Sequence, residues 1–393
     1  MDSVTDESRS PSSDTDDEGS YLDGAGATPI LPQAADATAR ALREFGDPRG
    51  AHRVARRAAA LLERSLTAAA AAVGADQDEV LAAPSGSHAN ALAVLGTTPS
   101  ANGRIVVSTL EHASVLEAAA ASGLHVVEVP CGEDGRMDVD RFASEVALPH
   151  TLLASVHHVS PDLGTMQPVA ECARIAREAG VPFHTDACQS AGSLPVDARA
   201  LGVDLLTLSS HKAYGPAGAG LLFARRGVRV DPFLRGEVRP GRANPVPNVA
   251  ALAGMAEALT LLKGEIADLA ARLWELSGRL RSGLDDAEAG LRVLGHPTHR
   301  APHLVAVAVS GVDRETLLMT LEDRGVLPGE ARSDVLVRAG VARAGEIVLR
   351  LGLTRDSTGG DVDRVLEMLP DVSRRLRGIA RRSGAAEEDA ARR

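Results

Sequence analysis

Short apolar runs alternate with amphipathic stretches through the middle of the chain, and this alternation constrains the possible fold more than any other feature. The apolar runs have the length and composition of buried strands, whereas residues 53–73 and 169–179 have the pattern of amphipathic helices. The predicted strands cover residues 104–108, 125–129, 152–157, 182–185, 204–208 and 220–223. Parallel strands need a crossover connection, which is usually a helix. The sequence therefore predicts an α/β fold with a mostly parallel sheet that helices cover on both faces.

A second, smaller unit follows the alternating region. Residues 249–280 form a long predicted helix that links the two units. Beyond it, the pattern predicts an α+β domain, because short strands there are mixed with two helices. The predicted strands are 291–294, 304–309 and 347–351, and the predicted helices are 314–323 and 360–369.

We place the domain boundaries from these patterns and from the polar ends of the chain. The large domain covers residues 20–260, and the small C-terminal domain covers residues 261–382. Residues 1–19 hold seven acidic side chains and one basic one, a composition that cannot bury a core, so we expect a disordered acidic tail. Residues 383–393 have the composition of a polar tail.

Charge and composition exclude several classes of protein. The net charge of −11, the pI near 5.6 and an aromatic content of 2% argue against nucleic-acid binding, which needs basic surfaces and stacking platforms. No apolar run approaches the ~18 residues of a membrane span. The three cysteines, Cys131, Cys172 and Cys188, have no metal-site spacing and leave an odd thiol, which argues against a disulfide framework. We expect a cytoplasmic enzyme that binds no nucleic acid, membrane or metal.

Lysine is almost absent from this chain, and its two positions are informative. Of the 42 basic residues, 40 are arginine and only Lys212 and Lys263 are lysine. Arginine replaces lysine well on surfaces, but guanidinium is not deprotonated in proteins and cannot attack carbon. Lys263 lies in LLKGE at 261–265, on a predicted helix surface. Lys212 follows a predicted strand in a polar, glycine-rich turn, so it is the candidate for covalent chemistry.

Polar residues gather directly after two of the predicted strands. The first group is HTDACQSAG at 184–192, and the second is SSHK at 209–212. In open α/β sheets, ligands bind at the carboxyl ends of the strands, so we expect the two groups to share one site. A lysine that forms a Schiff base, a carboxylate that keeps a pyridinium nitrogen protonated and hydroxyls that hold a phosphate suit pyridoxal phosphate. The groups supply these as Lys212, Asp186 and the serines.

With these motifs, the sequence resembles the class V aminotransferase-fold pyridoxal phosphate enzymes, specifically the cysteine desulfurase branch. The resemblance runs from Tyr21 to about Leu369. Besides the two polar groups, it rests on YLDGAGATP at 21–29, FGDP at 45–48, SGSH at 85–88 and LEH at 110–112. It implies fold type I, pyridoxal 5'-phosphate as cofactor, an amino-acid substrate and a homodimer.

The resemblance also implies roles for individual residues. Lys212 is the Schiff-base lysine, Asp186 is the partner of the pyridine nitrogen, and His112 stacks on the cofactor ring. Gln189 contacts the phenolic oxygen of the cofactor. The phosphate contacts come from one turn at a helix N-terminus and from the second polar group, and the residues are Ser87, His88, Ser209 and His211.

A segment near the C-terminus resembles the family's site for the substrate carboxylate. It reads LRLGLTRDST at 349–358, and its first arginine, Arg350, takes the carboxylate-binding position. The planar guanidinium fork can bind both carboxylate oxygens at once. A register two residues away puts Val348 there instead, but the spacing to Arg355 favours Arg350.

The chain departs from the family at the residue that accepts sulfur. Cysteine desulfurases carry a nucleophilic cysteine on a mobile loop, and the corresponding segment here, VLPGEARS at 326–333, has Arg332 at that position. Arg332 either contacts an anionic group of the substrate or fills a solvated loop. Cys188 is the only cysteine expected near the cofactor, and we interpret it as a buried structural thiol.

Two prolines replace further residues that contact the cofactor in the family. Pro161, in VSPDLG at 159–164, stands where an asparagine usually donates to the phenolic oxygen, and proline has no such donor. Ser160 or Gln189 are the candidates to replace it. Pro245, in RPGRANP at 239–245, stands where a hydroxyl residue reaches the phosphate of the partner subunit.

These observations predict an enzyme that cleaves a carbon–sulfur bond in cysteine or a cysteine-like S-conjugate. Without a thiol that accepts sulfur, β-elimination is the simplest route, with Lys212 taking the Cα proton. Three alternatives remain open: a class V aminotransferase, a desulfurase in which Cys188 or another group accepts sulfur, and a catalytically weak scaffold that binds the cofactor.

Overall fold

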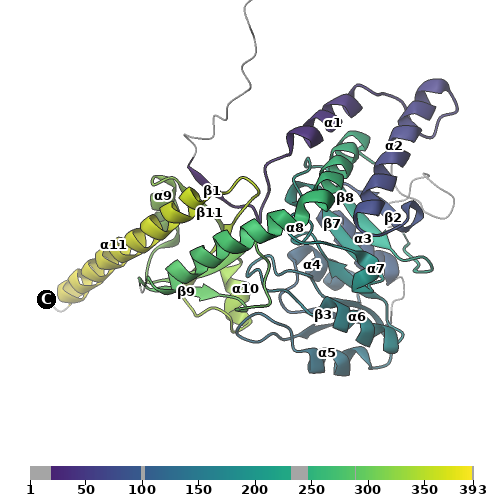
Figure 1. The fold of residues 1–393 in the computed structure, drawn as a ribbon. Coiled ribbons are helices and arrows are strands. Elements are labelled where there is room, and N and C mark those ends of the chain that lie inside the picture. The colour runs from purple at the N-terminus through teal and green to yellow at the C-terminus, as the bar shows by residue number, and fades with distance from the viewer. Residues whose placement is uncertain (1–18, 99–101, 232–246, 288, 392–393) are drawn as a thin grey trace, which may run out of the picture.

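The computed structural model describes residues 19–98, 102–231, 247–287 and 289–391, and it contains two β-sheets (Figure 1). In the larger sheet, the five consecutive strands β7, β6, β5, β3 and β4 are parallel, whereas β8 is antiparallel to both β7 and β2. The mostly parallel sheet predicted from the sequence is therefore confirmed. In spatial order its strands are β2 (Val80–Ala83), β8 (Gly220–Ala224), β7 (Leu205–Ser209), β6 (Phe183–Asp186), β5 (Thr151–Ser155), β3 (Arg104–Ser108) and β4 (His125–Val129).

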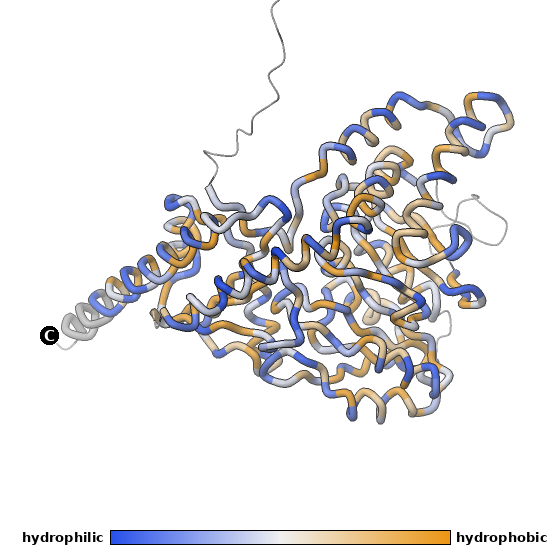
Figure 2. The backbone as a smooth tube through the Cα atoms, viewed as in Figure 1, coloured by the Kyte–Doolittle hydropathy of each residue, from blue (hydrophilic) through white to orange (hydrophobic). Residues whose placement is uncertain are grey.

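Helices cover both faces of the larger sheet. Neighbouring residues of a strand point to opposite sides, and apolar side chains on both sides must be buried. On β7, for example, Leu205 packs in one core cluster and Leu206 in the other. One face carries α2 (Arg53–Ala72), α5 (Val139–Val146), α6 (Val169–Glu178) and α7 (Ala198–Leu201). The other face carries α3 (Gly86–Thr97) and α4 (Ala113–Ala121). Figure 2 shows apolar segments gathered inside this body and polar ones along its outer edge.

The smaller sheet confirms the predicted α+β architecture of the C-terminal part. Its strands, in spatial order, are β1 (Ser20–Leu22), β11 (Val326–Glu330), β12 (Glu346–Gly352), β10 (Leu304–Ser310) and β9 (Leu291–Leu294). Its helices are α9 (Arg314–Glu322), α10 (Ser333–Arg338) and α11 (Gly359–Ala391). The segment from Gly384, which we expected to be a polar tail, is part of α11 up to Ala391.

Helix α8 (Val249–Asp285) belongs to both cores and joins them as one continuous element (Figure 1). Leu252 and Met255, near its N-terminus, are buried in the core beneath the larger sheet. Leu273 and Leu280 are buried in the core of the smaller sheet. Within the described residues, no helix is both long enough and apolar enough to cross a membrane.

The N-terminal segment ties the two parts together. Its strand β1 pairs in parallel with β11, so the start of the chain completes the smaller sheet. The segment then reaches the larger part, where the backbone N–H of Thr28 donates to the carbonyl of His211 at 2.8 Å. Helix α1 (Pro32–Leu42) follows and packs on α8. Residues 1–18, which include nearly all of the expected acidic tail, lie outside the described residues.

Three glycines of α8 give the fold a direct stability test. A methyl group on Gly254 would lie against Thr38 and within 2.9 Å of the carbonyl oxygen of Ala34, so this glycine lets α1 approach α8 closely. Gly264 and Gly278 have open space at the same position. We expect Gly254→Ala to lower the free energy of unfolding by ~1–3 kcal/mol through overpacking. Gly278→Ala should raise it by ~0.5–1 kcal/mol, because alanine is the better helix former.

Urea or thermal unfolding of the purified parent, Gly254→Ala and Gly278→Ala proteins measures both changes in the free energy of unfolding. Gly264→Ala is the second control, since it lies in the same helix and also faces open space. Equal effects of the substitution at Gly254 and Gly278 would contradict the close packing of α1 on α8.

Candidate active site

A cavity of about 240 Å³ lies at the carboxyl ends of β6 and β7, beside the N-terminus of α3. Asp186 is the last residue of β6 and Ser209 is the last residue of β7. The two polar groups that the sequence places after these strands therefore share one site, as expected. The residues that line it are Ser85, Gly86, Ser87, Asn90, His112, Asp186, Cys188, Ser209, His211 and Lys212.

The carboxylate of Asp186 is buried, with 7% of the residue exposed, and each of its oxygens accepts a hydrogen bond. The backbone N–H of Cys188 donates to Oδ1 at 2.9 Å, and Nδ2 of Asn90 donates to Oδ2 at 2.7 Å. Burial alone raises the pKa of a carboxyl group. The neighbouring His112 and the two donors outweigh that effect, and the pKa of Asp186 lies below its ordinary value. The site thus holds a fixed negative charge.

His112 caps the N-terminus of α4 and faces the same cavity. Its Nδ1 accepts from the backbone N–H of Ser114 at 3.1 Å and lies 2.7 Å from the Ser114 hydroxyl. Burial lowers the pKa of His112, and the positive charges of Lys212 and Arg332 add to this, against an opposing effect of Asp186. The surroundings of His112 therefore favour its neutral form more than water does.

Lys212 ends the short 3₁₀ turn Ser210–Lys212 that follows β7. Among the described residues, its amine has no hydrogen-bond or ion-pair partner, so it is free to react with a ligand in the cavity. The hydroxyl of Ser209 lies 3.1 Å from Nδ1 of His211. Burial and the nearby Lys212 lower the pKa of His211. The turn is anchored from outside by Thr28, whose hydroxyl also donates to the His211 carbonyl at 3.1 Å.

The N-terminus of α3 forms one wall of the cavity. Ser85 caps this helix by accepting from the backbone N–H of His88 at 3.1 Å. A methyl group on Gly86 would lie 2.7 Å from Sγ of Cys188 and 2.9 Å from Cβ of Ser209, so only glycine leaves this space open. Ser87 lines the cavity as expected, whereas His88 is not among the lining residues.

Gln189 does not line the cavity, although we expected it to contact the cofactor there. Its Nε2 donates to the carbonyl of Ala25 at 2.7 Å, and its Oε1 lies 3.4 Å from Nε2 of His303. Ser160, the other candidate to replace a donor at Pro161, is fully buried, and its hydroxyl accepts from the backbone N–H of Leu163. Neither side chain is turned towards the cavity in this structure.

Arg350 lies on the face of β12 that is turned towards the larger part. Its guanidinium donates to Oδ1 of Asp23 at 3.3 Å and to the carbonyl of Pro161 at 3.2 Å. Val348, two residues earlier on the same face, is buried in an apolar cluster and offers no polar group. Arg350 is outside the cavity lining, so the structure brings it next to Pro161 rather than next to Lys212.

Arg332 forms an ion pair that neither expectation for it anticipated. Its backbone N–H donates to Oδ1 of Asp162 at 3.1 Å, and its Nε and Nη2 donate to Oδ2 at 2.9 and 2.7 Å. Asp162 is only 2% exposed, so this charge needs a partner. The interpretation of Arg332 as a solvated loop residue is therefore wrong. Asp162 uses two of the five guanidinium N–H groups, through Nε and Nη2.

All three cysteines are free, and their surroundings disfavour the thiolate form. Burial raises the pKa of Cys131 to about 11 and that of Cys172 to about 12, and a nearby acidic side chain adds to each effect. Burial and the charge of Asp186 raise the pKa of Cys188 well above its ordinary value. Because the thiolate is the nucleophilic form, none of the three is activated to accept sulfur.

Two residues at the centre of the site were missed by the sequence analysis. Asn90 donates to both Asp186 and Ser114, and Ser114 contacts His112. Asn90 lies in an alanine-rich helix where no local pattern distinguishes it. Its position five residues after the Ser85 cap, on the face turned to β6, is the only signal that sequence offers.

Pro245, which stands where we expected a contact to the phosphate of the partner subunit, lies outside the described residues.

The residues present fit pyridoxal phosphate. The cavity offers a lysine amine without a partner, a buried carboxylate and hydroxyls beside a helix N-terminus, which are the groups that this cofactor requires. Gly220 lets β8 lie close to the turn that forms this wall, because a methyl group there would be 2.5 Å from the carbonyl of Ser85. In addition, Oδ1 of Asn90 is buried without a hydrogen-bond partner among the described residues.

Comparison with known proteins agrees with this chemistry. The family described as aminotransferase class V matches residues 20–365. The chain is 31% identical to the cysteine desulfurase IscS of Methanosarcina thermophila, over 93% of this chain and 95% of that protein. It is 32% identical to a cysteine desulfurase of Cereibacter sphaeroides, over 92% of this chain and 97% of that protein.

Solved structures give the same fold. A NifS-like protein from Rickettsia africae superimposes with a TM-score of 0.83 at 22% identity, over 90% of this chain and all but 1% of that one. A cysteine desulfurase from Thermococcus onnurineus superimposes with a TM-score of 0.81 at 23% identity, over 91% of this chain and 96% of that one. With its buried carboxylate and its lysine at the ends of adjacent strands, the chain belongs to the class V aminotransferase family of pyridoxal phosphate enzymes, in the cysteine desulfurase branch.

Proposed function

We propose that this enzyme cleaves the carbon–sulfur bond of cysteine or a cysteine S-conjugate by β-elimination. The observation that carries the proposal is that Arg332, paired with the buried Asp162, stands where the resemblance leads us to expect the cysteine that accepts sulfur. Burial also raises the pKa of each of the three thiols, Cys188 in the cavity wall included. An elimination needs no thiol on the protein: cysteine and water give a keto acid, ammonia and sulfide. The reaction then needs only a proton acceptor near Cα, a carboxylate-binding group and the cofactor.

The residues of the site supply these functions. Bound pyridoxal phosphate spreads the negative charge that forms at Cα into its ring. Asp186 would keep a proton on the ring nitrogen of the bound cofactor, because its carboxylate lines the cavity and its pKa is lowered. Lys212 takes the Cα proton, since its amine has no competing partner among the described residues. Arg350 binds the substrate carboxylate once its Nη2 no longer donates to Oδ1 of Asp23.

A second candidate, sulfur transfer, is favoured by the names of the relatives, which are cysteine desulfurases. That reaction converts cysteine and an acceptor thiol into alanine and a persulfide, so its products differ from those of elimination. With cysteine as substrate, we expect keto acid and ammonia in equal amounts without an added thiol. Alanine that forms only when a thiol is present would support sulfur transfer instead.

The free thiols also support a reducing compartment, and we propose the cytoplasm.

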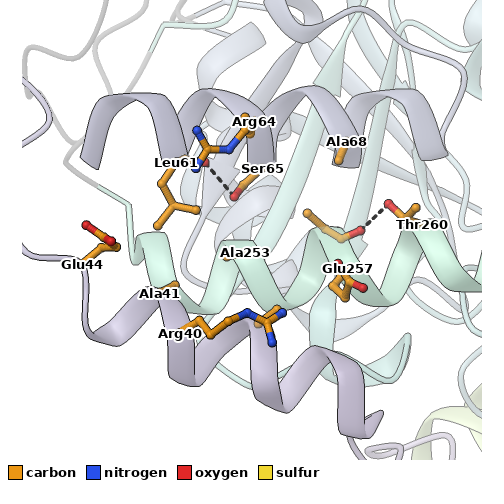
Figure 3. Close-up of a pocket in the computed structure, with 12 residues that line it drawn as sticks. Arg40, Ala41, Glu44, Leu61, Arg64, Ser65, Ala68, Ala253, Glu257 and Thr260 are labelled. Atoms are coloured by element: carbon orange, nitrogen blue, oxygen red, sulfur yellow. Dashed lines mark hydrogen bonds between the residues drawn. The ribbon is translucent and has the colours of Figure 1, made fainter. Parts of the chain in front are cut away.

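We further propose that the protein is a homodimer. Leu42 and Phe45, at the end of α1 and just after it, are both 71% exposed, which is costly in a monomer. Beside them, α1, α2 and α8 border a groove of about 390 Å³ (Figure 3). Arginines and glutamates both line the groove, and such mixed charge allows two copies to pair by a two-fold axis.

The dimer can be tested with a charge on the exposed apolar pair. We expect Phe45→Asp combined with Leu42→Asp to shift the protein from dimer to monomer in sedimentation velocity, because two copies would bury four unpaired carboxylates. Met319→Asp is the matched control, since Met319 is 67% exposed on α9, away from this surface. A wild-type protein that sediments as a monomer at micromolar concentration would overturn the dimer.

Covalent attachment of the cofactor tests the role of Lys212. Borohydride treatment of the cofactor-loaded protein should fix pyridoxal phosphate to a peptide that contains Lys212, as seen by mass spectrometry. Lys212→Ala should abolish the adduct and lower turnover by at least about a thousandfold, because no other amine lines the cavity. Lys263→Ala is the control, and it should leave the adduct intact. An adduct on Lys263 would refute the assignment.

Removal of the thiols tests the elimination route. We expect the variant with Cys131, Cys172 and Cys188 all changed to Ser to keep turnover within several-fold of the parent. Iodoacetamide at pH 8 should also spare the activity, because each thiol titrates well above that pH. A persulfide on Cys188 in the wild type during turnover, lost when an acceptor is added, would contradict the proposal.

A further inference from the structure

A line of hydrogen bonds connects the buried carboxylate of the site to its histidine. Nδ2 of Asn90 donates to Oδ2 of Asp186 at 2.7 Å and to the hydroxyl of Ser114 at 2.9 Å. The Ser114 hydroxyl in turn lies 2.7 Å from Nδ1 of His112. The four residues come from α3, α4, its cap and β6, so the line joins three separate elements.

The direction of each bond follows from the donors available. Nδ1 of His112 accepts from the backbone N–H of Ser114, so that nitrogen carries no proton and the neutral ring is protonated on Nε2. The Ser114 hydroxyl must then donate its single proton to Nδ1 and accept from another group. Asn90 provides that donor, and its second amide proton serves Asp186. The amide therefore has one favourable orientation.

The buried environment of Asn90 shows that this orientation is enforced. Only 1% of the residue is exposed, and its Oδ1 has no hydrogen-bond partner among the described residues. A flipped amide would place Oδ1 against the negative carboxylate of Asp186, which is worse than an unpaired acceptor. Both amide protons are thus committed to the two neighbours.

We propose that Asn90 and Ser114 are positioning residues, which hold the Asp186 carboxylate and the His112 ring in one relative orientation with the ring proton on Nε2. The inference rests on the proposed function, because Asp186 acts there on the cofactor on which the family resemblance places His112. The charged groups that act on His112 are Asp186, Glu111, Lys212 and Arg332. Asn90 and Ser114 carry no charge, and they set the relative orientation of the Asp186 carboxylate and the His112 ring.

The first experiment measures cofactor binding. We expect Asn90→Ala to weaken the affinity for pyridoxal phosphate on the order of tenfold, because Asp186 loses a hydrogen bond to its charged form. Thr97→Ala is the matched control: it removes a hydrogen bond on the same helix α3, to the Ala93 carbonyl, and its affinity should stay within twofold of the parent. Equal affinity for Asn90→Ala and the parent would overturn the role at Asp186.

The second experiment follows His112 itself by NMR of protein labelled with ¹⁵N-histidine, with His112→Gln to assign its signals. In the parent, the Nδ1 and Nε2 shifts should report a neutral ring protonated on Nε2. We expect Ser114→Ala and Asn90→Ala each to raise the protonation constant of His112, on the order of tenfold. Ser114→Ala removes a donor to Nδ1 of the neutral ring, and Asn90→Ala removes the donor that orients the Ser114 hydroxyl towards Nδ1. The double variant should show the same protonation constant of His112 as each single variant, because both substitutions interrupt the same series of hydrogen bonds.

The outcomes separate this inference from the proposed function. If Asn90→Ala does not fold, Ser114→Ala alone must still shift the titration of His112, and an unshifted titration would overturn the inference. Additive shifts in the double variant would also overturn it, because they indicate independent contacts. The titration needs no turnover, so a parent protein that binds pyridoxal phosphate but releases no keto acid overturns only the elimination.

Discussion

A negative charge buried at the end of β6 is the constraint around which the site is built. An ionised carboxylate in a protein interior is unfavourable unless donors surround it. For Asp186 these donors come from the next turn of the chain, at Cys188, and from helix α3, at Asn90. The position of α3 against the sheet is therefore tied to the charge state of Asp186. Gly86 and Gly220 allow this close approach, because a side chain at either would separate the helix terminus from the strands.

The same desolvation that shapes the cofactor site also disfavours the thiolate form of the cysteines. Burial raises the pKa of all three cysteines, and Asp186 adds to this at Cys188. At the position where the family presents its cysteine, Arg332 is paired with the buried Asp162. This ion pair joins the loop before α10 to the larger part, so the segment in which we expected a sulfur-accepting cysteine has a structural role here.

Much of the fold could be predicted because burial leaves a local pattern. The ends of β3 and β4 match the prediction to the residue, since β-branched residues make up most of both strands. Strand β11 was missed because it contains Pro328 and Gly329, and β2 because it is short and half alanine. In the site, the groups after β6 and β7 were predicted from strand ends. Asn90 and the partner of Arg332 were not, because contacts across 96 and 170 residues leave no trace in spacing.

The pairing of β1 with β11 has a consequence for how the chain is made. Ser20 is synthesised long before its neighbour Val326, because the whole larger sheet lies between them in the sequence. The larger sheet can close during translation, because its strands follow one another closely in sequence. The smaller sheet must wait, and closing so long a loop is slow. Until then the first strand is an open edge, and the turn that carries the active lysine lacks the anchor that this same segment provides.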